Sequence, residues 1–258
     1  MAEHVRVQKA LADAGVASRR AADALVAEGR VTVNGRPAVT GQRVDPAVDA
    51  LAVDGRVIVP AGKRTYLLMH KPAGVTSTVS DRHAQQTVLD LLPDEVQAAG
   101  ARLYPVGRLD KDSEGLILLT DDGDWAQHLL HPRYGVEREY AIGLRAPLDQ
   151  LHVEALTEGI ELDEGAATLG SLRMASRTEA ARLERDEAHG APLVWYRAVL
   201  TQGWKRQLRR MFAALGTPVE RLVRVRIGTL RIDDMYPGEV RRLSSSERER
   251  LAAARQAR

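Results

Sequence analysis

The hydrophobic pattern of the first 43 residues predicts two helices followed by a β-hairpin. Apolar residues recur at helical spacing in VQKALADAGV, and a second such run, SRRAADALVAEG, begins at Ser18 and ends at Gly29. Serine is a preferred N-cap, and glycine commonly ends a helix. The next segment, RVTVNGRPAV, has two short apolar runs around Asn34-Gly35, a strong local signal for a hairpin. A unit this small has a small core, so we expect its basic side chains to be exposed.

The rest of the chain divides at a short segment with linker composition. Residues 44–59 predict one or two further short strands, and PAGKR at 60–64 combines proline, glycine and charge. The C-terminal run SSSERERLAAARQAR can begin a capped, basic helix. We therefore predict a small domain over 1–60, a linker over 61–64, a larger domain over 65–243 and a basic tail over 244–258.

In the larger domain, predicted strands and helices interleave without the regular alternation of a doubly wound sheet. This indicates an α+β fold on a mixed, mainly antiparallel β-sheet with flanking helices. The predicted strands cover residues 66–69, 103–106, 115–120, 138–144, 168–174 and 193–201. The predicted helices lie near 87–92, 124–131, 147–157 and 206–215. Residues 176–190 are charged and lack an apolar period, so we predict a loop there.

Composition limits the chemistry that the chain can perform. Its 258 residues, 44% of them hydrophobic, are enough for a core, and no apolar stretch approaches the roughly 20 residues of a membrane span. The first residues lack the basic-then-apolar order of a secretory signal, so we expect a cytoplasmic protein. Cysteine is absent, which excludes disulfides, thiolate nucleophiles and Cys-ligated metal sites.

Charge is unevenly distributed behind a net value of +2. Residues 200–258 carry 14 basic and 6 acidic side chains, and seven of the eight basic residues from Lys205 to Arg231 are arginines. Guanidinium groups bind phosphate oxygens in a forked geometry and stack on bases. This block favours a nucleic-acid partner, with a solvated arginine-rich surface as the alternative.

The segment GRLDKDSEGLILLTDDG, residues 107–123, places Asp110, Asp112 and Glu114 at alternate positions before a glycine. An EF-hand calcium loop has oxygen ligands at such positions. However, position 12 is Asp121 instead of the preferred glutamate, and the apolar flanks predict strands where that loop needs helices. A glycosidase-type carboxylate pair and a plain acidic turn both remain open on these residues alone.

The histidines are scattered along the chain. His128 and His131 form the closest pair, and no third ligand accompanies them. We therefore predict no metal site.

The run from Val5 to Val39 resembles the S4-like RNA-binding module of ribosomal proteins and RNA-modifying enzymes. The resemblance implies that the second helix and the turn after it present Arg19, Arg20 and Arg30 to structured RNA. The alternative is a helical hairpin that only packs on its neighbour.

The segment GRLDKDSEGLILLTDDG resembles the catalytic signature of pseudouridine synthases that modify ribosomal RNA and often carry an S4-like module. Three further stretches agree in the family's order: HKPAGVTST (70–78), VEREYA (136–141) and GWKRQLRRMF (203–212). The resemblance covers most of residues 5–230. It implies that the bond from uracil N1 to ribose breaks and that C5 rejoins the ribose. Because this isomerisation has no net redox change, no cofactor and no metal are expected.

The same resemblance assigns catalytic roles to three residues. Asp110 is the essential carboxylate, acting as a nucleophile on ribose or base or stabilising developing positive charge. Tyr140 stacks on the flipped uracil and serves as a base. Arg209 pairs with Asp110 and keeps it ionised in a partly buried pocket.

Further residues are implied to contact the substrate or the RNA. Arg108 is a wedge or phosphate contact that helps turn out the base, and Leu222 is either the floor of the uracil pocket or ordinary core. Lys71 supports the site structurally or binds phosphate. The residues implied to hold the RNA backbone are Lys205, Arg206 and Arg210. Trp204 departs from the smaller turn of many members and could stack on a base.

The substrate follows from overall similarity. SDRHAQQTVLDLLP and LTQGWKRQLRRM resemble members acting on 23S ribosomal RNA more than those acting on 16S RNA. We expect a monomer whose partner is ribosomal RNA, with no membrane and no metal partner. The alternatives are the same reaction on 16S RNA and a non-catalytic RNA-binding or ribosome-assembly protein; intact Asp110, Tyr140 and Arg209 argue against the latter.

Overall fold

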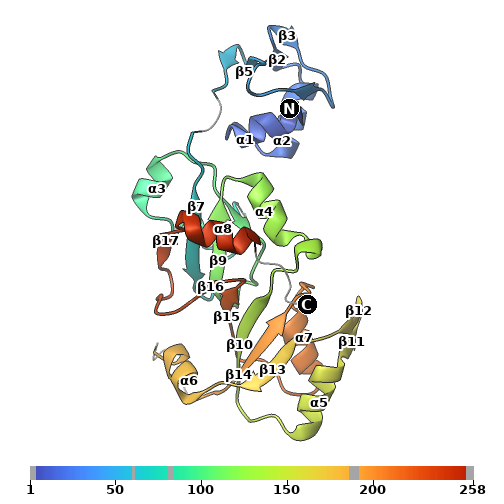
Figure 1. The fold of residues 1–258 in the computed structure, drawn as a ribbon, viewed down its shortest axis with the longest axis vertical. Helices are drawn as coiled ribbons and strands as arrows, with labels where there is room; N and C mark the ends of the chain where they lie inside the picture. Colours follow the sequence, from blue (N-terminus) through green and yellow to red (C-terminus); the bar gives the residue numbers. More distant parts are fainter. Residues whose placement is uncertain (1–3, 60–61, 81–83, 186–191, 254–258) are drawn as a thin grey trace.

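The computed structural model describes residues 4–59, 62–80, 84–185 and 192–253. A small N-terminal domain stands at one end of a larger α+β domain (Figure 1). Parts of the predicted linker and tail, residues 61 and 254–258, lie outside the described residues, as do residues 81–83 of the stretch SDRHAQQTVLDLLP.

The small domain has the predicted helices and hairpin. The Ser18 hydroxyl caps α2 by accepting a hydrogen bond from the Ala21 amide, and Asn34 and Gly35 have positive φ in the tight turn from β2 to β3. A four-stranded sheet has the order β3-β2-β5-β6, and β1 pairs with β4. The elements are β1 Val5–Arg6, α1 Val7–Asp13, α2 Arg19–Ala27, β2 Val31–Val33, β3 Arg36–Pro37, β4 Arg43–Val44, β5 Leu51–Val53 and β6 Arg56–Val57.

The larger domain is built on one sheet of nine strands in the order β13-β14-β10-β15-β9-β7-β17, with β16 beside β15 and β8 beside β9. Its named strand pairs are antiparallel apart from β9 with β15, so the predicted mixed, mainly antiparallel sheet is confirmed. The strands are β7 Tyr66–Lys71, β8 Tyr104–Val106, β9 Glu114–Thr120, β10 Arg138–Leu144, β13 Ser171–Met174, β14 Val194–Leu200, β15 Arg221–Ile227, β16 Leu230–Arg231 and β17 Val240–Arg242.

Helices cover the two halves of this sheet separately (Figure 1). One apolar cluster joins residues of β10 and β14 to α5 and α7, and another joins residues of β7 and β9 to α4 and α8. A small hairpin of β11 Ile160–Leu162 and β12 Gly165–Ala167 follows α5. The helices are α3 Asp94–Ala98, α4 Gly123–Leu130, α5 Gln150–Glu158, α6 Arg177–Leu183, α7 Gln207–Ala214 and α8 Ser245–Ala253, with a 3₁₀ turn at Pro132–Tyr134.

Two predicted elements are wrong. Residues 87–92 form turns instead of a helix, because the Asp90 carboxylate accepts hydrogen bonds from the amide and hydroxyl of Thr87. The predicted loop over 176–190 contains α6, which starts with a capping box between Ser176 and Glu179. None of its residues is buried, so the apolar period gave no signal; residues 186–190 lie outside the described part of the chain.

The two halves of the sheet meet where β9 runs parallel to β15. Gly115 lies opposite Arg224 in this contact, and a Cβ on Gly115 would stand 2.3 Å from the Arg224 carbonyl oxygen. Beside it, Arg221 Nε and Nη2 donate to the two carboxylate oxygens of Glu114 at 2.7 and 2.8 Å. Their side chains are only 7% and 5% exposed. A bidentate buried ion pair therefore crosses the junction.

We predict that Glu114→Gln destabilises the larger domain by about 3–5 kcal/mol, because it leaves the Arg221 charge buried without its partner. Chemical denaturation measures the loss as a lower unfolding midpoint at the same m-value as that of the unaltered protein. The matched control is Glu220→Gln, which breaks the exposed pair with Arg145 and should leave the unfolding midpoint nearly unchanged. Equal midpoints for both variants would contradict the role given to the junction.

The two domains touch through polar contacts. Lys9 Nζ bridges Asp13 at 2.7 Å and Asp124 at 2.9 Å. Arg64 Nη1 donates to the Asp13 carbonyl at 2.8 Å and to the Asp121 carbonyl at 3.0 Å. The apolar clusters of the larger domain contain no residue of the small one among those that the structure describes. We propose that the boundary near residue 60 separates two folding units.

Deletion of residues 1–60 should leave the larger domain folded, because the core of the larger domain is complete without the small one. The deletion should also weaken RNA binding, because it removes the basic side chains of the small domain. A cooperative unfolding transition, together with binding measured at several salt concentrations, checks both parts, since lost phosphate contacts reduce the salt dependence. An unfolded truncated chain would show that the boundary is misplaced.

Candidate active-site cleft

A cavity of about 1320 Å³ opens where the two halves of the sheet meet. Its wall on one side is the loop between β8 and β9, and on the other side β10, β15 and the segment that leads into α7. All four sequence motifs that were singled out contribute residues, through Ser77, Asp110, Tyr140 and Trp204 among others. A cavity of this size is larger than a typical small-ligand pocket and can admit part of a nucleic acid.

The Asp110 loop is fixed by hydrogen bonds to the segment after β7. The Ser77 hydroxyl donates to the Leu109 carbonyl at 2.9 Å and accepts from the Leu109 amide at 3.1 Å. The Gly74 amide donates to the Lys111 carbonyl at 2.7 Å. The loop lies between two strands, so it lacks the flanking helices of a calcium loop. The Asp110 side chain remains 31% exposed toward the cleft.

The expected pairing of Arg209 with Asp110 is not the arrangement observed. Arg209 Nε lies 3.4 Å from the Asp112 carboxylate, and its Nη atoms donate to the carbonyls of Asp112 and Val219. Asp112 also receives two hydrogen bonds from Arg206 at 2.9 and 3.0 Å, which hold its pKa below the usual value. The Asp110 carboxylate is 3.8 Å from Arg206 Nη1. Asp112 therefore interacts with both Arg206 and Arg209, whereas Asp110 has only the more distant contact with Arg206.

Lys71 does not contact the cleft in the way a phosphate ligand would. Its side chain is fully buried, and Nζ donates to the carbonyls of Pro72, Val75 and Lys111 at 2.9, 2.8 and 3.3 Å. Burial lowers the pKa of Lys71 to about 8, against the opposing effect of nearby carboxylates. Lys71 thus joins the β7 turn to the Asp110 loop, which favours the structural alternative over the phosphate contact.

Tyr140 and Leu222 line the same cavity as Asp110. Tyr140 on β10 lies directly across from Arg224 on β15, and both line the cavity. Leu222 is 5% exposed, lines the cavity and belongs to the apolar cluster beneath it. Leu222 therefore serves the core and the cleft together.

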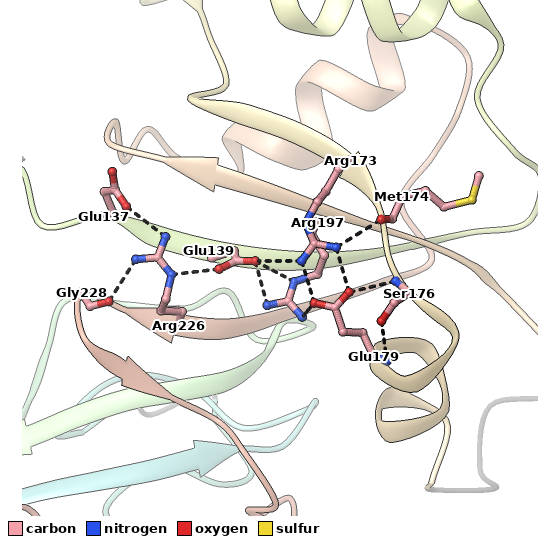
Figure 2. A network of polar contacts seen from close by, with 9 residues as sticks. All are labelled: Glu137, Glu139, Arg173, Met174, Ser176, Glu179, Arg197, Arg226 and Gly228. Carbon is pink, nitrogen blue, oxygen red and sulfur yellow. Dashed lines mark hydrogen bonds and ion pairs between the residues drawn. The ribbon is translucent and has the colours of Figure 1, made fainter. Parts of the chain in front are cut away.

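Glu139 and Tyr140 are neighbours on β10, so their side chains point to opposite faces of the sheet. The ladder with β15 shifts register between them. Figure 2 shows Glu139 between Arg197 of β14 and Arg226 of β15, with nitrogen–oxygen distances of 2.8 Å to each. Burial raises the pKa of Glu139, but the two guanidinium groups outweigh it, so the net pKa lies below the usual value.

The network continues to α6, whose Glu179 lies 3.2 Å from Arg197 and 2.6 Å from Arg173 of β13 (Figure 2). It ties four strands and one helix together behind Tyr140. The sequence gave no indication of it, because its members lie far apart along the chain.

The remaining predicted RNA contacts divide into free and paired cations. Arg108 and Lys205 line the cavity and are exposed, with no ion pair or hydrogen bond of their side chains within the described residues. Arg210 instead binds both oxygens of Glu164 at 2.8 Å and lies 3.4 Å from Asp163. Arg210 therefore joins α7 to the β11–β12 turn. Its guanidinium is already bound by acids, so it is not free for the predicted contact with the RNA backbone.

The small domain shows the same division. Arg19 and Arg20 are exposed at the start of α2. Arg30 is engaged by both oxygens of Asp54, at 2.8 and 2.6 Å, and by Glu28 at 3.2 Å; the Asp54 bonds chiefly raise its pKa. The first two arginines have no ion-pair partner among the described residues, whereas Arg30 is paired with two acids.

Three basic cavity residues, Lys111, Arg138 and Arg224, were missed by the sequence analysis. Arg138 lies two positions before Tyr140, and Arg224 two positions after Leu222. Side chains two apart on a strand share a face, so the period of two could have placed both in the cleft.

The two histidines differ in their surroundings, since His128 is packed and His131 is exposed at the edge of the cavity. His128 stacks on Tyr134 with ring centroids 3.7 Å apart and bonds the Ala252 carbonyl through Nε2. His131 Nδ1 accepts from the Arg133 amide. Across the described ranges, no three metal-ligating side chains gather, and no helix among them is long and apolar enough to cross a membrane.

Comparison with known proteins agrees with this geometry. The family of RNA pseudouridylate synthases matches residues 65–214, and the S4 domain family matches residues 5–48. A protein of Mycobacterium tuberculosis described as an uncharacterized RNA pseudouridine synthase is 39% identical, over 94% of this chain and 91% of its own.

Two further relatives extend the comparison. The ribosomal large subunit pseudouridine synthase B of Bacillus subtilis is 34% identical over 96% of both chains. A crystal structure of a pseudouridylate synthase superposes with a TM-score of 0.62 at 25% identity and covers 96% of this chain and 99% of that one. The chain therefore belongs to the RNA pseudouridylate synthases that carry an N-terminal S4 domain, and it is an isomerase that converts uridine in RNA to pseudouridine.

Proposed function

We propose that this protein isomerises one uridine, or a few adjacent ones, in 23S ribosomal RNA. The observation that carries the proposal is the cleft whose lining brings Asp110, Tyr140 and Leu222 together. Support for the large-subunit substrate comes from the B. subtilis relative, whose name states that substrate, and from one of Pseudomonas aeruginosa with the same name and 36% identity. The P. aeruginosa protein is longer, since the match covers 60% of it.

Asp110 is the proposed reactive carboxylate. Its side chain faces the cavity, while the arginines nearby are held mainly by Asp112. A carboxylate in this position attacks the ribose or the base, or stabilises the positive charge that develops on the ribose. The N1–C1′ bond breaks, the uracil turns, and the C5–C1′ bond forms.

Tyr140 and Leu222 are the proposed base pocket. The phenol ring packs on the flipped uracil, and Leu222 supplies an apolar surface beneath it. As C5 joins the ribose, it loses a proton and N1 gains one. We assign the C5 proton to the Tyr140 oxygen, which is the phenolic group on this wall of the cavity.

The free cations around the cleft are the proposed RNA contacts. Arg108, Lys111 and Lys205 line the cavity without acidic partners within the described residues, and the unpaired Arg19 and Arg20 extend the positive surface onto the S4 domain. Phosphate contacts of this kind position the RNA without reading its sequence. Arg206 keeps Asp112 in place and is a positioning residue in this scheme.

Pseudouridine mapping of ribosomal RNA from cells that lack this protein tests the proposal. We expect 23S RNA to lose one site or a few adjacent ones, and re-supply of the intact chain to restore them. Asp110→Asn should restore none, because the amide is neither a nucleophile nor a negative charge.

The matched control is Asp163→Asn, which changes an aspartate that is 97% exposed on the β11–β12 turn and should rescue fully. An unchanged map, or rescue by the Asp110 variant, would contradict the assignment. Loss confined to 16S RNA would move the substrate to the small subunit.

A further inference from the structure

Two arginines of the cleft stand beside Tyr140 without an acidic partner. Arg224 lies directly across from Tyr140 in the β10–β15 ladder, and Arg138 precedes Tyr140 by two residues on the same strand. The Arg138 guanidinium lies near Gly203, since a Cβ built on that glycine would be 3.7 Å from its Nη1. Both arginines line the cavity.

Their hydrogen-bonding capacity is mostly unused. Arg224 is 4% exposed; its Nε donates to the Leu116 carbonyl at 2.7 Å, and its Nη2 is buried with no hydrogen-bond partner. Arg138 makes no side-chain hydrogen bond or ion pair with any residue that the structure describes. Burial lowers the pKa of Arg138, and the charge of Arg224 adds to this effect. A buried charge left unpaired is costly, so the pair is poised for an anion.

Two other buried or half-buried arginines of the domain differ in this respect. Arg221 and Arg226 are buried or half-buried and bound by Glu114 and Glu139. In the described lining of the cavity there is one carboxylate, Asp110, whose near ionic neighbour is Arg206. Arg138 and Arg224 therefore line the cavity without a carboxylate of the described residues bound to them.

We propose that Arg138 and Arg224 form an anion subsite that binds a backbone phosphate adjoining the flipped uridine. A phosphodiester is the anionic group that such a nucleotide carries, and guanidinium groups match its oxygens. The inference rests on the proposed function and extends it. With the base against Tyr140 and the phosphate on this pair, the ribose is held at C1′ opposite Asp110 while the uracil turns. Arg138 and Arg224 are positioning residues in this account.

A scan with neutral phosphates tests the subsite. Synthetic stem-loops contain the uridine mapped above, and each carries one methylphosphonate at a successive position around it. Binding is measured in an Asp110→Asn background, which blocks turnover. We expect one position at which the neutral group weakens binding of that protein about tenfold or more, since a charge-assisted hydrogen bond is lost there.

The same methylphosphonate scan with the Arg138→Gln variant tests whether Arg138 binds the sensitive phosphate. The variant should weaken binding of the unmodified stem-loop by a similar factor and show no further loss at that one position. Arg138→Lys should retain part of the effect as a point charge. Arg145→Gln, which alters an arginine 76% exposed and paired with Glu220, should leave the scan unchanged.

Two results would overturn the inference. One is a scan without any sensitive phosphate beside the target while the intact chain still converts the unmodified stem-loop. The other is a methylphosphonate position that weakens binding by the same factor in the protein with Arg138 and in the Arg138→Gln variant. Absence of conversion by the intact chain would instead contradict the proposed function, and this inference with it.

Discussion

The parallel contact between β9 and β15 is the constraint on which the rest of the structure depends. It joins two halves of a sheet that have separate helical layers and separate apolar clusters. Glycine at position 115 allows the strands to approach, and the buried Glu114–Arg221 pair fixes them laterally. Asp110 lies just before β9 and Tyr140 lies on β10, which pairs with β15, so the same contact sets the distance between the proposed reactive carboxylate and Tyr140. Activity and stability are therefore coupled at one short stretch of ladder.

Arginines in this protein have three kinds of surroundings, and these separate their roles. Some are bound by acids on the far face of the sheet, where they hold strands in register behind Tyr140. Some are bound at the surface, as Arg30 and Arg210 are. Others face the cleft with free donors. A high arginine content alone indicates a nucleic-acid partner, but only the pairing shows which guanidinium groups are available to phosphate.

Sequence patterns predicted the elements whose signals are local. The capped helices, the Asn34-Gly35 hairpin and the strands around Asp110 follow from spacing over a few residues. The α6 helix was not predicted because its apolar residues, Ala180 and Leu183, are few and only partly buried. The surroundings of Lys71, Arg209 and Arg210 could not be predicted, since their partners come from other elements and are chosen by packing. Resemblance gave the motif residues; the structure gave their neighbours.

The most direct test of the central claim uses the purified chain and two unmodified transcripts. Incubation with 23S and 16S ribosomal RNA made in vitro, followed by nucleoside analysis and site mapping, measures conversion without any other cellular component. The account predicts pseudouridine at one site, or a few adjacent ones, in the 23S transcript and none in the 16S transcript. Failure to form pseudouridine in either transcript, or in any ribosomal precursor particle supplied in their place, would contradict it.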